Sequence, residues 1–329
     1  MKAVIVTQYG GPEVLQVRDI DRPEPTVNEV RIRLEYAGVN YTDVYNRNGL
    51  CAKSHTYANE PPFTLGREGA GTIDAIGADV QGWAVGDRVA YCLTLGSYAQ
   101  YACVPAWRLV KIPDGVSRKV ATTLMLQGST AHYLTHSLFR LQPGHSCLIH
   151  AASGGVGQLL LQIAKLRGAQ VFATVGSEEK ATLARAHGAD DVILYRDEDF
   201  AEIVRRETGG DGVDVVYDSV GKATIAGSIR SCKQRGTVCN FGAASGAVES
   251  INPFQLAEAG SVFFTRPHMA DYMRDAHEIS WRGGEMLELV NTGAVRVRVD
   301  RVLALDEAEQ AHRILEGRGT TGKLLLSTH

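Results

Sequence analysis

The stretch that decides the fold is CLIHAASGGVG (residues 147–157), which continues as QLLLQIAK to residue 165. Apolar residues come first, glycines interrupt them, and apolar residues then return at helical spacing, so we expect a buried strand, a tight turn and an amphipathic helix. Gly154 and Gly157 occupy the second and third positions of the G-x-G-x-x-G spacing, and Ala152 stands at the first. Such glycines let backbone N–H groups and the helix N-terminus approach a pyrophosphate. The stretch therefore predicts the start of a dinucleotide-binding fold, against the alternative of a turn whose glycines serve packing alone.

Further apolar runs follow at the spacing of alternating strands and helices. Strands are expected at 170–175, 192–195, 213–221, 236–240 and 261–267, with helices at 121–134 and 200–207. This pattern predicts an α/β fold with a doubly wound parallel sheet. Ligands bind at the carboxyl ends of such strands, so Ser219 and the segment Phe241-Gly242-Ala243 should line a cofactor site. After this region, a helix is expected at 281–291 and strands at 295–299 and 323–326.

Composition excludes several classes of partner. The chain has 329 residues, of which 44% are apolar and 22% charged, as in a globular protein of about two domains. A formal net charge of −3 offers no field that attracts nucleic acid or anionic lipid. The six cysteines lie far apart without a C-x-x-C pair, and no apolar run is long enough for a signal peptide or a membrane span. We expect a cytoplasmic protein that binds small molecules, with no nucleic acid or membrane partner.

Residues 1 to 123 have a different character, with short strands and no helical periodicity. Alternating apolar and charged residues are typical of half-buried strands, and glycines inside strands mark bulges and corners of barrels. Strands are expected at 4–6, 14–17, 29–34, 66–73 and 85–90. This part of the chain therefore predicts a small, partly open β-barrel.

Several motifs together resemble one protein family. The spacing Gly66-x-Glu68-x-x-Gly71, the tetrapeptide GDRV at 86–89 and the glycine turn, in this order, resemble the medium-chain dehydrogenase/reductase superfamily. The run from Gly144 to Lys165 is similar to the signature of its zinc-independent quinone oxidoreductase branch, the zeta-crystallin-like proteins. The opening at 10–15 and the ending at 311–316 also resemble that branch, so the resemblance covers essentially the whole chain.

The resemblance implies an architecture and an assembly. It implies a GroES-like substrate domain at 1–123 and 267–329, and a Rossmann-type NADPH-binding domain at 124–266. In this branch the last strand of the cofactor domain, here within 261–267, pairs with its copy in another subunit. A homodimer is therefore expected.

The positions of the zinc ligands carry other residues in this chain. Zinc-dependent relatives have a cysteine and a histidine where Asn40 and Arg67 stand here. Zinc requires soft or borderline donors, and a guanidinium repels the ion. His132 and His136 are four residues apart on an expected helix, and we interpret them as surface or partly buried histidines. No metal is predicted.

The end of the second strand of the cofactor domain indicates which cofactor is bound. An NAD-selective site has Asp or Glu about 20 residues after the glycines, whereas this chain has Gly176 and Ser177, with Lys180 one turn later. No carboxylate there repels a 2′-phosphate, so NADPH is favoured. Glu178 and Glu179 argue mildly the other way, although first-turn carboxylates also complement a helix dipole. A solvated surface lysine is the alternative for Lys180.

The resemblance adds further cofactor contacts. Lys180, Tyr195 and Arg318 would surround the adenosine phosphate, and Thr130 would lie near the nicotinamide, with a packed helix threonine as its alternative. The remaining expected cofactor residues are Asn40, Ala152, Ser153, Gly154, Gly155, Val156, Gly157, Gly176, Ser177, Ser219, Phe241, Gly242, Ala243, Phe264 and Arg266.

The candidate catalytic residues lie in the segment that holds ligands in the zinc relatives. Asn40, Tyr41 and Tyr45 stand there, in a stretch expected to be a loop, while Asp43 is interpreted as structural. A neutral amide and two phenols can hydrogen-bond quinone oxygens or relay a proton through water. A packing role with a satisfied hydroxyl is the alternative for Tyr45. No Ser/His/Asp or Cys/His set is suggested by the spacing.

The predicted function is metal-free hydride transfer from NADPH to a quinone. An electron-poor quinone or conjugated enone accepts hydride without the Lewis acid that alcohol oxidation needs. A 2-alkenal or enone double-bond reductase of the same branch is the alternative enzyme. A non-enzymatic crystallin-like or RNA-binding protein is the alternative outside enzymes, and the net charge speaks against RNA. The segment 51–62 carries no motif, so the sequence does not identify the acceptor.

Overall fold

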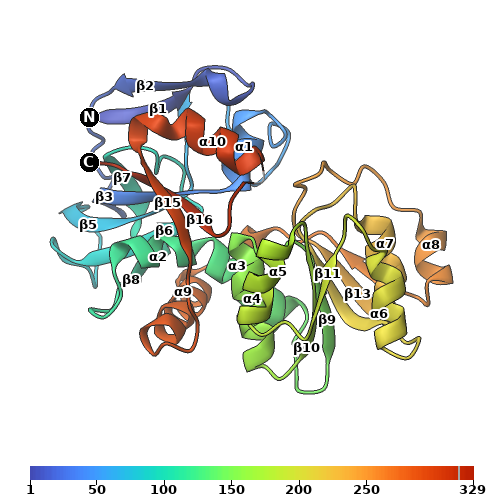
Figure 1. Ribbon diagram of the computed structural model, residues 1–329. Coiled ribbons are helices and arrows are strands. Elements are labelled where there is room, and N and C mark those ends of the chain that lie inside the picture. The colour runs from blue at the N-terminus through green and yellow to red at the C-terminus, as the bar shows by residue number, and fades with distance from the viewer. Residues whose placement is uncertain (318) are drawn as a thin grey trace. The chain divides into compact units, whose positions relative to one another are not determined.

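The structure is a computed structural model that describes residues 1–317 and 319–329 (Figure 1). It divides into two compact units. The first consists of Met1–Ser129 and Met273–His329, and the second of Thr130–Tyr272. The boundaries expected after residues 123 and 266 lie close to these. In the described ranges, no helix is both long enough and apolar enough to cross a membrane.

The second unit is built on a six-stranded sheet in which every pair of neighbours is parallel. In spatial order its strands are β11 (Asp191–Leu194), β10 (Gln170–Val175), β9 (Ser146–Ile149), β12 (Val213–Asp218), β13 (Cys232–Asn240) and β14 (Phe263–Thr265). The connecting helices are α4 (Gly155–Leu166), α5 (Glu178–Ala186), α6 (Phe200–Glu207), α7 (Ile225–Ser231) and α8 (Pro253–Glu258). In Figure 1, α4 and α5 lie on one face of the sheet and α6 and α7 on the other. This confirms the predicted doubly wound α/β fold.

The strand order reverses beside β9, because the chain first adds β10 and β11 on one side and then places β12 on the other. In such sheets the ligand lies outside the carboxyl ends of the strands at this reversal. The turn after β9 is therefore placed at the ligand-binding edge by the topology of the sheet.

The stretch at 147–165 folds as its pattern predicts. Cys147, Leu148 and Ile149 in β9 are fully buried, and α4 buries Leu159, Leu160, Leu161, Ile163 and Ala164. Gly154 caps the helix in an extended conformation, and the chain leaves the helix through Gly168, which has a φ of +76°. Burial of each leucine side chain contributes about 1.5–3 kcal/mol, so packing against the sheet stabilises this helix more than its own propensity does.

The first unit contains the barrel. A three-stranded sheet has the order β2 (Leu15–Asp19), β1 (Lys2–Val6) and β4 (Phe63–Thr64). A seven-stranded sheet has the order β15 (Val299–Ala304), β16 (Lys323–Ser327), β3 (Glu29–Val39), β5 (Glu68–Ile76), β6 (Arg88–Cys92) and β8 (Leu109–Lys111), with β7 (Tyr101–Pro105) also paired to β3. Its helices are α1 (Tyr41–Arg47), α2 (Arg118–Met125), α9 (Ala276–Asn291) and α10 (Ala308–Glu316).

Three local expectations were wrong. The helix expected around 121–134 is divided into α2, α3 (Gln127–Tyr133) and a π-helical turn at Leu134–Leu138. At the first division the N–H of Leu126 donates to the Glu68 carboxylate, a contact with a distant strand that no local pattern encodes. The strand expected at 295–299 is β15, which begins at Val299. The expected loop at 40–45 is the helix α1 with Asn40 as its N-cap residue.

Candidate functional site

The predicted cofactor residues of the second unit gather at one edge of its sheet. Every strand of this sheet is parallel, so all carboxyl ends lie at the same edge. The glycine turn follows β9, and Gly176 and Ser177 follow β10. Tyr195 follows β11, Ser219 follows β12, and Arg266 follows β14. The segment 241–243 follows β13 at the same edge.

Two glycines of the turn, Gly154 and Gly157, are under different steric constraints. A Cβ on Gly157 would overlap the carbonyl oxygen of Ala151 and stand 2.7 Å from the Ala152 Cα. A Cβ on Gly154 would meet only the Ala151 oxygen, at 3.1 Å. Gly157 is therefore required for the helix to pack on the strand, whereas Gly154 keeps the start of the helix bare. Ala152 and Ser153 are buried, and Gly155 and Val156 are half-buried.

The turn after β10 brings Gly176 and Tyr195 together. A Cβ on Gly176 would lie 3.0 Å from the Tyr195 hydroxyl, and the Tyr195 side chain is 39% exposed. Ser177 caps α5, and its hydroxyl accepts a hydrogen bond from the N–H of Lys180 at 3.4 Å. These residues combine a bare backbone, a phenol and a cation at one helix N-terminus, an arrangement that suits a phosphate.

The loop after β12 is ordered by Asp218, which the sequence analysis did not select. The buried Asp218 carboxylate accepts hydrogen bonds from the N–H groups of Val220 and Gly221, at 2.8 and 2.9 Å. A Cβ on Gly242 would overlap the Ser219 carbonyl oxygen, so the two neighbouring loops touch through their backbones. Ser219 and the segment 241–243 are thus held at the sheet edge by backbone contacts.

The remaining predicted residues of this unit have varied surroundings. Thr130 is 7% exposed, and its hydroxyl lies 3.6 Å from the Met269 sulfur. Phe264 lies half-buried in β14. The exposed Arg266 donates to the Asn240 carbonyl oxygen at 2.8 Å. Arg318 lies outside the described residues.

In the first unit, Asn40 belongs to a buried cluster with Glu68 and Lys323. The Lys323 ammonium donates to the Asn40 side-chain oxygen at 2.6 Å and to the Glu68 carboxylate at 2.5 Å. The Asn40 amide donates to the same carboxylate at 2.9 Å and to the Gly38 carbonyl oxygen at 3.3 Å. Lys323 and Glu68 have side chains that are 1% and 0% exposed. Both amide hydrogens of Asn40 are used in this cluster, so the side chain is fixed in orientation and retains capacity only as an acceptor.

A second set of buried polar groups continues from Asp43 to the surface. Arg47 donates to His312 Nδ1 at 2.9 Å, and since arginine has donors only, Nδ1 accepts and Nε2 carries the proton. His312 Nε2 lies 3.2 Å from the Tyr98 hydroxyl, which donates to the Asp43 carboxylate at 3.2 Å. Burial and the Arg47 charge lower the pKa of His312 to about 3. Arg47 also forms a two-pronged ion pair with Glu316, with both distances 2.9 Å.

Asp43 is the titrating group of this set. Burial raises the pKa of its carboxyl to about 7, although the hydrogen bond from the Asn40 N–H, 2.9 Å long, acts in the opposite direction. The carboxyl is therefore protonated in the folded protein over a range in which it is ionised in the unfolded chain.

We expect Asp43→Asn to remove a pH dependence of stability. In the wild type, the protonated Asp43 carboxyl contributes to the free energy of unfolding in full below pH 4. This contribution is lost as pH rises through about 7, because between these two values the unfolded chain releases the proton while the folded protein keeps it. The free energy of unfolding of the wild type should therefore fall relative to the variant by roughly 3–4 kcal/mol over this window. Urea denaturation at several pH values measures the difference. The exposed Asp79→Asn is the matched control, and equal slopes in all three proteins would contradict the assignment.

Tyr41 and Tyr45 lie on α1, directly after Asn40. Their ring centroids are 6.0 Å apart, and both side chains are half-buried. The Tyr41 hydroxyl donates to the Leu315 carbonyl oxygen of α10 at 3.2 Å. The helix thus carries two phenols, directly after the residue whose amide orientation is fixed.

The residues at the positions of the zinc ligands do not fit zinc. The Asn40 oxygen already accepts from an ammonium group, and Arg67 places a buried positive charge at the second position. A cation would lack both a soft donor and a favourable field there.

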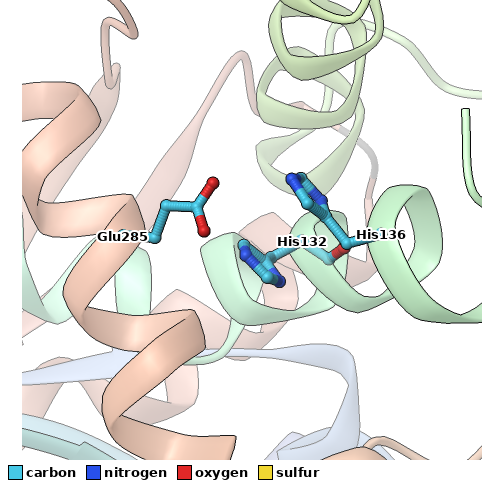
Figure 2. A group of neighbouring side chains, drawn as sticks. All are labelled: His132, His136 and Glu285. Atoms are coloured by element: carbon cyan, nitrogen blue, oxygen red, sulfur yellow. The ribbon is translucent and has the colours of Figure 1, made fainter. Parts of the chain in front are cut away.

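The histidine pair lies on α3 and the π-helical turn that follows it (Figure 2). The rings of His132 and His136 stack with centroids 4.0 Å apart and planes 6° apart. His136 Nδ1 lies 3.0 Å from the His132 carbonyl oxygen. His132 is fully buried and His136 half-buried, so neither is a surface residue. Glu285, also labelled in Figure 2, lies on α9 of the first unit.

The similarity to known proteins extends over almost the whole chain. Residues 26–114 match the family model described as alcohol dehydrogenase GroES-like domain, and residues 155–279 match the model described as zinc-binding dehydrogenase. A quinone oxidoreductase of Pseudomonas aeruginosa is 40% identical over 99% of both chains. A 2-haloacrylate reductase of a Burkholderia species is 38% identical over 98% of both chains. A solved mycobacterial structure complexed with NADPH has a TM-score of 0.95 and 41% identity, and the match covers 99% of this chain and 100% of that one.

Proposed function

The chain belongs to the quinone oxidoreductases of the medium-chain dehydrogenase/reductase superfamily, and on that premise we propose that it transfers hydride from NADPH to a quinone without a metal. The observation that carries the proposal is the edge of the six-stranded sheet, where a glycine turn and the segment from Gly176 to Lys180 lie together. No carboxylate follows β10 at the position that would hold a ribose 2′-hydroxyl. The mycobacterial neighbour that was solved with NADPH supports the same cofactor.

We assign the cofactor contacts to the residues at this edge. The glycine turn would hold the pyrophosphate, and Ser177, Lys180 and Tyr195 would hold the adenosine phosphate. The backbone cradle fits such a group, because Gly154 leaves the helix N-terminus bare. When bound, NADPH supplies the hydride. The residues of this chain orient the acceptor, exclude water and supply a proton.

The proton is assigned to the phenols of α1. Asn40 has both amide hydrogens engaged, so its proposed role is to accept a hydrogen bond and to hold its part of the site in position. Tyr41 and Tyr45 on α1 both carry phenol protons that can be relayed to an acceptor. Tyr45 is the proposed donor, directly or through water.

We expect Lys180→Glu to shift the cofactor preference from NADPH toward NADH. Replacing the cation by a carboxylate removes a charge-assisted contact and adds repulsion toward a 2′-phosphate, so the KM for NADPH should rise at least about tenfold while the KM for NADH changes little. Oxidation of the nicotinamide with 1,4-benzoquinone as acceptor, followed by absorbance, measures both. Arg185→Glu on the same helix, where Arg185 pairs with Glu178, is the control. An equal effect on both cofactors would overturn the role of Lys180, and a wild type inactive with every quinone would overturn the function.

A second candidate function is reduction of an activated carbon–carbon double bond. The similarity to the protein named 2-haloacrylate reductase favours it. This reaction needs a proton at the α-carbon, so Tyr45→Phe should slow an enone more than a quinone if Tyr45 is the donor. Comparing the two acceptors at equal NADPH concentration decides between the functions.

We also propose a homodimer and a cytoplasmic location. β14 is the edge strand of the six-stranded sheet, and its Phe263 side chain is 63% exposed, which suits pairing with a second copy of the strand. All six cysteines are free thiols, which suits a reducing compartment. Sedimentation velocity tests the assembly, and a single-chain mass at micromolar concentration would exclude it.

A further inference from the structure

Arg67 is a buried cation with weak hydrogen bonds. It lies between β4 and β5 and is 6% exposed. Its guanidinium makes three long contacts: 3.4 Å to the Leu93 carbonyl oxygen, 3.3 Å to the Asn46 side-chain oxygen and 3.3 Å to the Tyr57 carbonyl oxygen. Its Nε has no hydrogen-bond partner among the described residues. Isolated buried charges cost several kcal/mol unless they are paired, so this arrangement calls for a compensating anion.

A second arginine faces the same carbonyl oxygen. Arg108 donates to the Leu93 oxygen at 2.7 Å, so two guanidinium groups meet at one acceptor. The Nε of Arg108 is also buried without a partner in the described part of the chain, as is the hydroxyl of Thr94, which follows Leu93. The Arg108 charge and burial both lower the pKa of Arg67, burial being the larger cause. Two guanidinium groups, those of Arg67 and Arg108, thus meet at Leu93. Three donors there have no partner within the described chain: the Nε atoms of both arginines and the hydroxyl of Thr94.

No carboxylate of the described chain neutralises this pair. Neither guanidinium has an Asp or Glu oxygen within the 4.0 Å of an ion pair in the ranges 1–317 and 319–329. Asp43 is the carboxylate that acts most strongly on Arg67, but its carboxyl is itself buried and has a pKa of about 7, so near neutral pH it carries only part of a charge. The compensating anion is therefore expected from outside the chain.

The Nε edge of Arg67 has the geometry of a carboxylate receptor. Its Nε is buried and unused in the described ranges, and both hydrogens of Nη2 are engaged only in contacts of 3.3 Å, so a carboxylate that displaces one of these contacts would bind across the planar fork of Nε and Nη2. Arg67 also directly precedes Glu68, which anchors Asn40, and it contacts Asn46 on α1, the helix that carries Tyr41 and Tyr45. An anion at this fork would lie beside the candidate catalytic residues.

Resting on the proposed function, we propose that Arg67, assisted by Arg108, binds a carboxylate of the acceptor, so that the preferred acceptors are quinones or enones bearing a carboxylate. For an enone acid, the acceptor takes hydride from NADPH, which becomes NADP⁺, at the carbon β to the ketone. The double-bond electron pair then takes a proton at the α-carbon. The carboxylate is unchanged in this step and serves only to hold the acceptor.

The test compares trans-3-benzoylacrylate with its methyl ester, which lacks the negative charge and carries one additional methyl group. In the wild type the ratio of kcat/KM for acid over ester should exceed that in Arg67→Met by roughly 10- to 100-fold, because a hydrogen-bonded charge pair is lost. Arg67→Lys, which keeps the charge without the fork, should lie between them. The exposed Arg18→Gln should match the wild type. Equal ratios in wild type and Arg67→Met would overturn the proposal.

A binding measurement separates this proposal from the proposed function. The saturated acid 3-benzoylpropionate has no double bond to reduce, so calorimetric titration of the wild type with it reads the anion site without turnover. Binding to the wild type and at least about tenfold weaker binding to Arg67→Met support the site even if quinones are not reduced. Equal binding to both proteins, with thermal unfolding showing that both are folded, would show that Arg67 only holds the segment that contains Tyr57.

Discussion

Gly157→Ala is expected to lower the free energy of unfolding by about 3 kcal/mol and to abolish measurable NADPH binding. The added methyl group would overlap the Ala151 carbonyl oxygen and approach the Ala152 backbone at 2.7 and 2.9 Å. These are backbone atoms of the turn that follows β9, so no side chain can move aside to relieve the overlap. The helix α4 must shift away from β9, and the backbone N–H groups of the turn shift with it.

Gly154→Ala is the matched control for this variant. Its Cβ would meet one atom at 3.1 Å, and its backbone is extended, so the stability loss should remain below about 1 kcal/mol. The NADPH affinity of this variant should nevertheless fall, because the methyl group covers the start of the helix. Urea denaturation and calorimetric titration with NADPH measure the two quantities separately. If Gly157→Ala is as stable as Gly154→Ala, the packing role of Gly157 is wrong.

Lys323→Met is expected to cost about 3–5 kcal/mol of stability and most of the turnover. Removal of the ammonium leaves the Glu68 carboxylate buried with hydrogen bonds from Asn40 and the Leu126 N–H but without a counter-charge within 4.0 Å among the described residues. Leaving one buried charge without its partner destabilises the folded protein far more than removing both charges of the ion pair. Asn40 also loses the donor that fixes its oxygen.

A second variant separates the stability effect from the positioning effect. In Glu68→Gln with Lys323→Met no buried charge remains in the cluster, so much of the stability should return. The kcat with 1,4-benzoquinone should stay low, because Asn40 still lacks the Lys323 donor. Lys323→Arg keeps the charge and should retain more stability than Lys323→Met. A double variant that is no more stable than Lys323→Met would contradict this account of the cluster.

Local patterns were sufficient for the strand, turn and helix at 147–165. The glycines, the apolar strand and the helical spacing all lie within 20 or so residues, and the same physical requirements act in the folded unit. The alternation of strands and helices predicted the doubly wound parallel sheet, because such alternation leaves few topologies open. These features were predictable because each depends on residues that are close in sequence.

The candidate catalytic cluster was only partly predictable, because its members are far apart in sequence. Asn40 was selected, but its partners Glu68 and Lys323 are separated from each other by 255 positions, and nothing near Lys323 marks it as buried. The signal that was present is the G-x-E spacing itself, since a carboxylate among glycines of a buried strand requires a partner. The helix α1 was predicted as a loop because its sequence has little apolar periodicity. Its start is stabilised by the Asp43 carboxylate, which accepts a hydrogen bond from the Asn40 N–H three residues earlier.

The position of β16 sets an order of events during synthesis. This strand follows the second unit in the chain, yet it lies inside the seven-stranded sheet between β15 and β3. The second unit is continuous from Thr130 to Tyr272, so all of its residues are available before β16 is translated. In the first unit, β3 stays unpaired on that side until β16 emerges from the ribosome. Nascent chains stalled before Lys323 would thus contain all of the second unit while the first unit still lacks β16 and the ammonium that anchors Asn40.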